Sequence, residues 1–234
     1  MKIFAIDSPL MRVLGKISDL MILNILTLLC CIPLVTAGAA FTAMHYVSLK
    51  MVRGEESGIT KMFFHSFKDN LKQSTVIWIL FLLVAAIFGL NFMLLYANPT
   101  EVSTFVFGGS ISSCALILFI TSMVWPVQAR FANTIPRTLK TAFVFSFRYF
   151  PRTLLILISS FVPFALYLVG NLGLMLTPLI FTFGFSGPAY LAAMLYSGPF
   201  RKAEEAYYES HPEDAPDRGS DEERIFTDVD GSDS

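Results

Sequence analysis

Residues 75–97 read TVIWILFLLVAAIFGLNFMLLYA, and after the turn residues Asn98 and Pro99 residues 104–127 continue TFVFGGSISSCALILFITSMVWPV. Glu101 is the only Asp, Glu, Lys or Arg between residues 74 and 129, and residues 153–200 contain none. A membrane-spanning helix needs roughly 20 apolar residues. Each stretch is about twice that length and is broken near its middle by turn residues, so each predicts a pair of crossings.

The composition also indicates a membrane environment. The chain has 234 residues, of which 54% are hydrophobic and 15% charged, and this is more apolar material than a soluble core of this size needs. Residues 1–200 carry 13 Lys and Arg against 6 Asp and Glu, whereas residues 201–234 carry 4 against 12. We therefore predict an all-α, polytopic membrane bundle over residues 1–200 and an acidic, mostly disordered cytoplasmic tail over residues 201–234.

Five spans are expected, with one open question in the first. They cover residues 20–44, 75–97, 104–127, 153–170 and 172–196. Gly170, Asn171 and Gly173 mark the turn between the last two. In the first segment Pro33 and Gly38 leave a re-entrant or two-piece element open as an alternative to a single crossing.

The connections indicate which side faces the cytoplasm. Residues 48–73 and 128–152 each carry five Lys or Arg, and the positive-inside rule places both in the cytoplasm. Five crossings then leave the tail inside and the N-terminus outside. Lys2, Arg12 and Lys16 favour the opposite for the N-terminus, so an N-terminus inside stays an alternative.

The two basic connections resemble each other at an offset of 80 residues. Phe63, Ser66, Phe67, Lys68 and Lys72 align with Phe143, Ser146, Phe147, Arg148 and Arg152. We expect two interfacial amphipathic helices, with phenylalanines at the acyl boundary and cations at anionic headgroups, unless the match is a chance recurrence of anchor residues. The predicted headgroup cations are Lys61, Lys68, Lys72, Lys140, Arg148 and Arg152.

The sequence offers little for chemistry. The motifs of nucleotide-binding loops, zinc proteases and hydrolases are absent, and His45, His65 and His211 have no further ligand at metal-binding spacing. Cys30, Cys31 and Cys114 lie in apolar runs and are interpreted as helix-packing thiols. We therefore predict no catalytic residue, no cofactor, no metal site and no nucleic-acid partner.

Neutral polar residues and helix breakers within the spans allow two interpretations. Asn24 and Asn91 are expected to hydrogen-bond across helices, and prolines are common in membrane helices. The functional interpretation is a path for a neutral solute that is formed by Asn24, Asn91, Pro178, Gly187 and Pro188, with the last span unwound in its middle.

Three pairs of small residues at four-residue spacing predict close helix contacts. They are Ala85 with Gly89, Gly108 with Ser112, and Gly109 with Ser113. The absence of charge within the spans counts against a proton-coupled or sodium-coupled pump.

Several short motifs resemble those of one family. They are MKIF at residues 1–4, DSPL at 7–10, CCIPLVTAG at 30–38, LKMVRGEE at 49–56 and SFK at 66–68. Together they make approximately residues 1–200 similar to the YesL family of bacterial membrane proteins, a domain of unknown function. The resemblance implies a multi-pass protein of the bacterial cytoplasmic membrane, often encoded near sugar importers, and it supplies no catalytic residues.

Three hypotheses about function follow. The first is a non-enzymatic accessory or partner protein linked to carbohydrate uptake, which contacts the lipid bilayer and a membrane transport or envelope protein. The alternative is a facilitator or transporter for a neutral solute such as a sugar. A third is an intramembrane lipid-modifying enzyme, which would need Asp19, His45 and Arg53 to meet in space.

Overall fold

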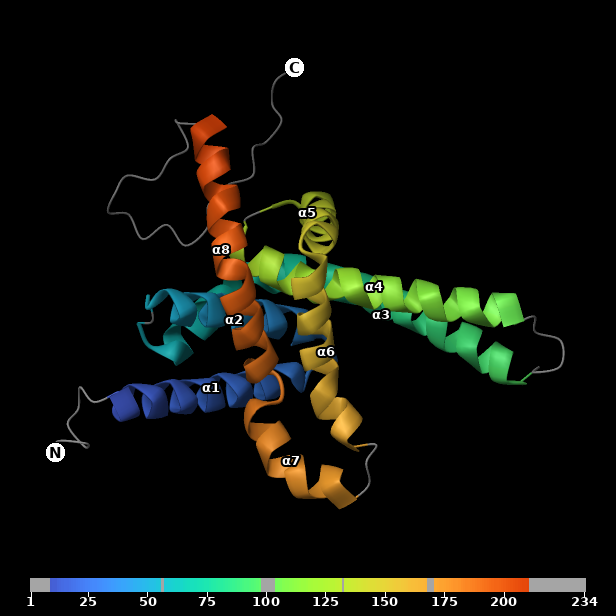
Figure 1. The fold of residues 1–234 in the computed structure, drawn as a ribbon, viewed down its shortest axis with the longest axis horizontal. Coiled ribbons are helices and arrows are strands. Elements are labelled where there is room, and N and C mark those ends of the chain that lie inside the picture. Colours follow the sequence, from blue (N-terminus) through green and yellow to red (C-terminus); the bar gives the residue numbers. More distant parts are fainter. Residues whose placement is uncertain (1–8, 56, 98–103, 132, 168–170, 211–234) are drawn as a thin grey trace.

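The computed structural model describes residues 9–55, 57–97, 104–131, 133–167 and 171–210, and over these residues the protein consists of helices and short connections without strands (Figure 1). The helices are α1 (Pro9–Cys31), the 3₁₀ turn η1 (Leu34–Thr36), α2 (Ala37–Arg53), α3 (Ile59–Ala97), α4 (Thr104–Arg130), α5 (Ile135–Arg148), α6 (Phe150–Tyr167), α7 (Asn171–Phe183) and α8 (Ser186–Ser210). The predicted all-α class is confirmed. The turn residues Asn98, Pro99 and Gly170, and the acidic tail after residue 210, lie outside the described residues.

The described helices include enough apolar length for the expected number of crossings. α1, α3 and α4 are each long and apolar enough to cross a membrane. The bent pairs α5 with α6 and α7 with α8 raise the number to as many as five. By length and composition these are the helices of an integral membrane protein, and the prediction of about five spans is confirmed.

The first apolar segment is a helical hairpin, so the expected single span over residues 20–44 is divided between α1 and α2. The division has a local cause, because Pro33 has no N–H donor and interrupts the helical hydrogen bonds. The Thr36 hydroxyl donates to the Cys30 carbonyl at 2.7 Å and closes the turn. In Figure 1 the start of α1 and the end of α2 lie on the same side of the molecule.

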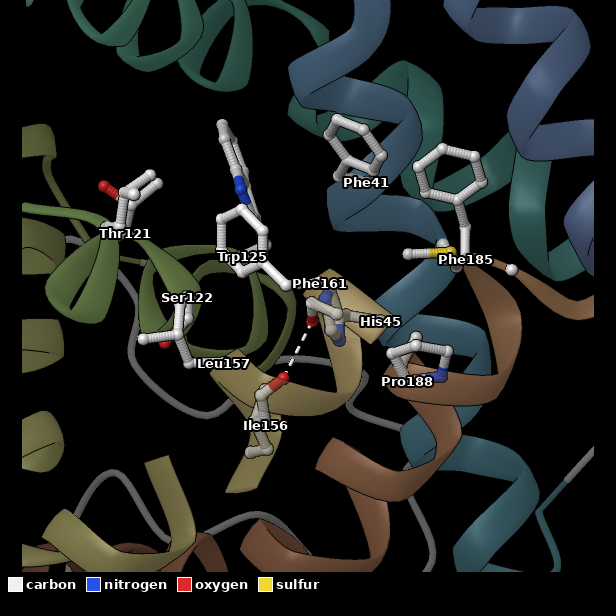
Figure 2. A pocket seen from close by; sticks show the side chains of 15 residues that line it. Phe41, His45, Thr121, Ser122, Trp125, Ile156, Leu157, Phe161, Phe185 and Pro188 are labelled. Atoms are coloured by element: carbon white, nitrogen blue, oxygen red, sulfur yellow. Dashed lines mark hydrogen bonds between the residues drawn. The ribbon is translucent and has the colours of Figure 1, made fainter. Parts of the chain in front are cut away.

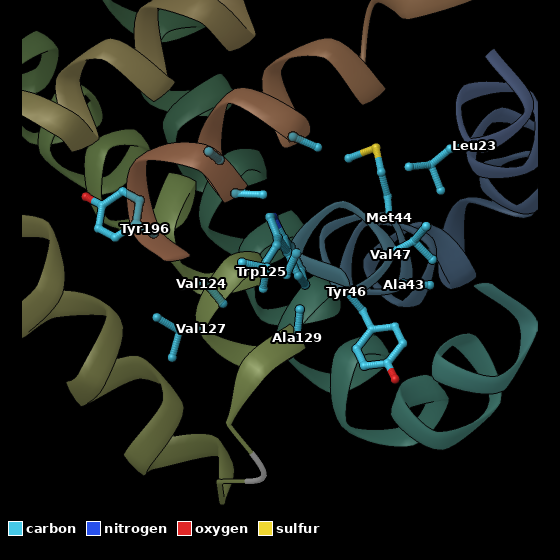
Figure 3. Packing of buried hydrophobic residues seen from close by; sticks show 14 of the residues in the cluster. Leu23, Ala43, Met44, Tyr46, Val47, Val124, Trp125, Val127, Ala129 and Tyr196 are labelled. Carbon is cyan, nitrogen blue, oxygen red and sulfur yellow. The ribbon is translucent and has the colours of Figure 1, made fainter. Parts of the chain in front are cut away.

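α2 is the central helix of the fold. Thirteen of its residues are buried, and it packs against α1, α3, α4 and α8. The buried core joins Leu23 of α1, Val47 of α2, Trp125 of α4 and Tyr196 of α8 (Figure 3). This burial explains why α2 has no lipid-facing stripe of its own.

α2 approaches α3 closely because its first turn consists of small residues. A Cβ on Gly38 would lie 2.6 Å from the Ser74 carbonyl oxygen and 2.7 Å from the Trp78 Cβ. Beside this contact the hydroxyls of Thr42 and Ser74 share a hydrogen bond at 3.0 Å. The Gln128 side-chain amide donates to the Ser74 hydroxyl at 3.0 Å, which links α2, α3 and α4 through buried polar groups.

Two helical arms leave this core in different directions (Figure 1). One arm consists of the outer halves of α3 and α4, and the other consists of α6, α7 and the start of α8. Both expose large apolar side chains, among them Leu83, Leu90, Leu94, Ile111, Leu155, Ile158 and Leu179. Continuous exposed apolar surface of this kind indicates contact with lipid.

The two units that align at an offset of 80 residues differ in geometry. α3 runs without a break from its basic first half into the membrane segment, over about 58 Å. α5 and α6 are instead bent by 104° at Tyr149. Pro151 occupies the position that aligns with Leu71, and proline both lacks an N–H donor and disfavours helical backbone in the residue before it.

The phenylalanine stripes of the two units also differ. Phe63 is fully buried and packs on the core, so this side of α3 faces protein. Phe143 and Phe147 of α5 are 49% and 45% exposed, as expected for side chains at the acyl boundary.

Candidate functional site

A groove of about 320 Å³ separates α3 and α4 along their outer halves. It is lined by Ile87, Phe88 and Asn91 of α3 and by Val106, Gly109, Ser110 and Ser113 of α4. The sequence had singled out Asn91 as a polar residue within a span and Gly109 with Ser113 as a small-residue pair. The fold therefore brings two separately predicted features together in one groove.

Asn91 contributes an unsatisfied polar atom to this groove. Its Oδ1 is shielded from solvent and has no hydrogen-bond partner among the described residues. Ser110 lines the same groove, but its hydroxyl already donates a hydrogen bond to the Val106 carbonyl at 3.0 Å. An unpaired buried acceptor costs about 1–3 kcal/mol, and the groove therefore favours an external hydrogen-bond donor.

The small-residue pairs do not make the predicted close contacts within the chain. Nothing lies within 4 Å of the position that a Cβ would occupy on Gly89, Gly108 or Gly109. These faces of α3 and α4 are open, and an open small-residue face in a membrane permits close approach by another helix.

Asn24 has a different environment and a structural role. Its Nδ2 donates to the Phe181 carbonyl at 2.6 Å, and its Oδ1 accepts the backbone N–H groups of Phe185 at 2.9 Å and Ser186 at 3.0 Å. These N–H groups belong to the start of α8, where a helix has no partners of its own for them. Asn24 is fully buried and therefore stabilises the 48° break between α7 and α8.

The other predicted path residues are spread over the second arm. Pro178 lies exposed within α7, and Gly187 and Pro188 lie in the first turn of α8. Pro188 lines a cavity between α2, α4, α6 and α8. The structure thus groups Asn24, Gly187 and Pro188 around the break and leaves Asn91 in the groove of the other arm.

Five of the six predicted headgroup cations are exposed. They are Lys61, Lys68 and Lys72 on α3 and Lys140 and Arg148 on α5. Arg152 is half-buried instead. Its Nη1 donates to the Leu195 carbonyl at 3.1 Å, and its guanidinium lies 5.5 Å from the centre of the Tyr149 ring. Arg152 therefore also fastens α6 to α8.

Sequence reasoning missed a buried charged cluster that joins α2, α4 and α8. Glu204 pairs with Arg130, and both residues are more than nine-tenths buried. Arg53 Nη2 lies 3.5 Å from the same carboxylate oxygen. Burial and the neighbouring Arg130 lower the pKa of the Arg53 guanidinium, and Glu204 acts in the opposite direction. The sequence indicated this cluster only weakly, because Glu204 is the first acidic residue after the last apolar run.

The residues proposed for an enzyme are not assembled in one place. His45 and Arg53 are eight residues apart on α2, which corresponds to about 12 Å along a helix axis. Arg53 is turned toward Glu204, whereas His45 lines the cavity beside Pro188. Over the described residues no group of three or more His, Cys, Asp or Glu side chains is placed to hold a metal ion.

Comparison with known proteins gives one similarity. Residues 20–92 match a family described as protein of unknown function, DUF624. The matched part contains Asn24, α2 and most of α3, including Asn91. No curated protein and no solved structure matches the chain.

Proposed function

We propose that this integral membrane protein is a non-enzymatic partner protein that docks a transmembrane helix of another membrane protein in the groove between α3 and α4. The observation that carries the proposal is that Asn91 lines the groove and that its Oδ1 atom is shielded from solvent without a hydrogen-bond partner among the described residues. A donor from a second helix would satisfy it. Interhelical hydrogen bonds of this kind contribute about 0.6–2 kcal/mol in membranes.

The shape of the groove fits such a helix. Association within lipid depends on close packing, because lipid tails are as apolar as the side chains they would leave. Gly109 lets a neighbouring backbone approach α4, since nothing lies within 4 Å of its missing Cβ. The partner helix should therefore have a small-residue face and a Ser, Thr or Asn donor level with Asn91.

The resemblance to the YesL family supports a particular kind of partner. That family is often encoded near sugar importers, so we propose a transport or envelope protein of carbohydrate uptake in a bacterial cytoplasmic membrane. The acidic tail and the basic connections 48–73 and 128–152 would then face the cytoplasm. This part of the proposal rests on the resemblance and on charge, and the groove itself does not identify the partner.

Site-specific photo-crosslinking in native membranes tests the proposal. A benzophenone amino acid at Ile87 lies in the groove, and one at Leu90 lies on α3 as a control outside it; both positions are exposed. We expect Ile87 to capture one defined membrane protein and Leu90 not to capture it. Gly109→Leu and Asn91→Leu should abolish this capture, whereas Gly108→Leu should preserve it because Gly108 lies outside the groove.

Two results would contradict the proposal. One is recovery of a monomer from mild detergent together with equal labelling from Ile87 and Leu90. The other is crosslinking of Ile87 only to a second copy of this chain, which would assign the groove to self-association.

A facilitator for a neutral solute is the second candidate, and the break between α7 and α8 favours it. Interrupted helices form solute sites in many transporters. Solute flux into proteoliposomes that is unchanged by Pro188→Ala would contradict a role of the α7–α8 break in transport.

A further inference from the structure

A cavity of about 210 Å³ lies where the two arms meet the core (Figure 2). Its walls come from α2, α4, α6 and the break between α7 and α8. Phe41, Trp125, Phe161 and Phe185 make most of this surface aromatic and apolar. The cavity is separate from the groove on the α3–α4 arm and shares no lining residue with it.

His45 brings an imidazole ring to the wall of this cavity. It is only 8% exposed, and among the described residues none forms a hydrogen bond with its imidazole. The hydroxyls that line the cavity are already used as donors. Thr121 donates to the Ile117 carbonyl at 2.7 Å, Ser122 to the Phe119 carbonyl at 2.7 Å, and Ser160 to the Ile156 carbonyl at 2.9 Å.

A buried polar side chain without a partner is costly, and most such groups in proteins are satisfied. A buried imidazole in apolar surroundings is neutral, with one nitrogen as a donor and the other as an acceptor. A hydroxyl group complements it, because a hydroxyl both donates and accepts. A carboxylate would instead need a cation, and Arg53, the cation further along α2, is turned toward Glu204.

We propose that the cavity binds a membrane-dissolved alcohol, with its hydroxyl on His45 and its hydrocarbon part against Phe41, Trp125, Phe161 and Phe185. An apolar cavity of about 150 Å³ accommodates benzene, so this cavity has room for one ring or the end of a branched chain. A sugar fits poorly, because its several hydroxyls would meet apolar walls and leave polar groups unpaired.

The ligand reaches the cavity from the lipid. Leu118 of α4 and Phe161 of α6 line the cavity and are themselves 40% and 47% exposed. The opening therefore lies between α4 and α6, on a surface that faces acyl chains.

Quenching of Trp125 fluorescence tests the proposal. The chain has two tryptophans, so a Trp78→Phe background leaves Trp125 as the only emitter. The full-length protein in detergent micelles is titrated with a brominated fatty alcohol and with the matching brominated alkane. We expect saturable quenching by the alcohol, at a concentration about fivefold lower than for the alkane, as one neutral hydrogen bond contributes about 1 kcal/mol.

Three variants make the result specific to the cavity. Ser160→Phe fills it, whereas Ser159→Phe adds the same ring at the next residue, which does not line the cavity. Both serines are half-buried and donate to the Ile156 carbonyl at 2.9 Å, so they are closely matched. Ser160→Phe should abolish saturable quenching and Ser159→Phe should retain it. His45→Leu should keep alkane binding and remove the preference for the alcohol.

Equal quenching in the two serine variants would contradict binding of the alcohol in this cavity. Equal affinity for alcohol and alkane in the wild-type protein would overturn the role of His45. Because misfolding of Ser160→Phe would also abolish quenching, His45→Leu serves as the second variant, and its size-exclusion profile is compared with that of the wild-type protein.

Discussion

The Asn24 side-chain oxygen accepts the backbone N–H of Ser186 at 3.0 Å across a separation of 162 residues. This contact ties the first helix to the start of the last one and caps α8 in place of a local residue. A residue that the sequence marked for a solute path therefore holds the helix break itself.

Replacing Asn24 should destabilise the fold. Asn24→Leu leaves the N–H groups of Phe185 and Ser186 unpaired in a buried site, and we expect a loss of about 1–3 kcal/mol. Thr27→Val is the control, because the buried Thr27 hydroxyl donates a hydrogen bond to the Leu23 carbonyl, one turn earlier in its own helix. Thermal unfolding in detergent should show the larger shift for Asn24→Leu, and equal shifts would contradict the capping role.

A methyl group at Gly38 should disturb the contact between α2 and α3. The added Cβ would lie 2.6 Å from the Ser74 carbonyl oxygen, so Gly38→Ala should cost about 1–3 kcal/mol through overpacking. Gly15→Ala is the matched change on α1, where nothing lies within 4 Å, and it should be neutral or slightly stabilising. Midpoints of thermal unfolding compare the two variants. An unchanged unfolding midpoint for Gly38→Ala would contradict this, because it would mean that α2 and α3 can move apart without loss of stability.

Removing the buried acid should be far more harmful than removing its exposed neighbour. Glu204→Gln leaves Arg130 and Arg53 without their carboxylate, and breaking a buried pair typically costs about 3–5 kcal/mol. Glu205 pairs with Arg201 at 3.5 Å on the exposed side of α8, so Glu205→Gln should change stability by less than about 0.5 kcal/mol. Expression level and detergent stability of the two variants provide the measurement. Similar behaviour would show that the cluster does not hold α8.

The α1–α2 hairpin predicts a different topology at the N-terminus from that of five simple crossings. A reporter at the N-terminus and one inserted after Gly54 should lie on the same side, because both ends of the hairpin point the same way (Figure 1). Reporters after Asn98 and Gly170, which lie outside the described residues, should both report the opposite side. An outside signal from the N-terminal reporter together with an inside signal after Gly54 would restore the single crossing over residues 20–44.

Local features of the sequence were enough for the helical class and for the presence of several helices that are long and apolar enough to cross a membrane. The turn at Pro33 was visible as a possible break, but whether α2 returned beside α1 depended on the small residues that let α2 pack onto α3. The difference between the continuous α3 and the bent α5–α6 pair could have been read from Leu71 and Pro151, since proline acts locally.

The candidate sites were less predictable, because burial of a polar group depends on distant neighbours. Asn24 and Asn91 are both amides within apolar runs, and nothing in their flanking residues distinguishes the fully bonded one from the one with an open acceptor. His45 stood at the end of an expected span, and its position in a cavity depends on α4, α6 and α8.

The sequence by itself determined that the chain is a helical membrane protein, because crossing a bilayer requires only local properties: length, apolarity and the absence of charge. The tertiary structure decided which polar groups are paired. It supplied the hydrogen-bond partners of Asn24 and buried Glu204 beside two arginines. It also left the Asn91 side-chain oxygen without a partner among the described residues and placed His45 in the wall of a cavity. The physical reason is that a hydrogen bond or ion pair needs a partner within about 3–4 Å, and only the packing of helices that are distant in sequence supplies it.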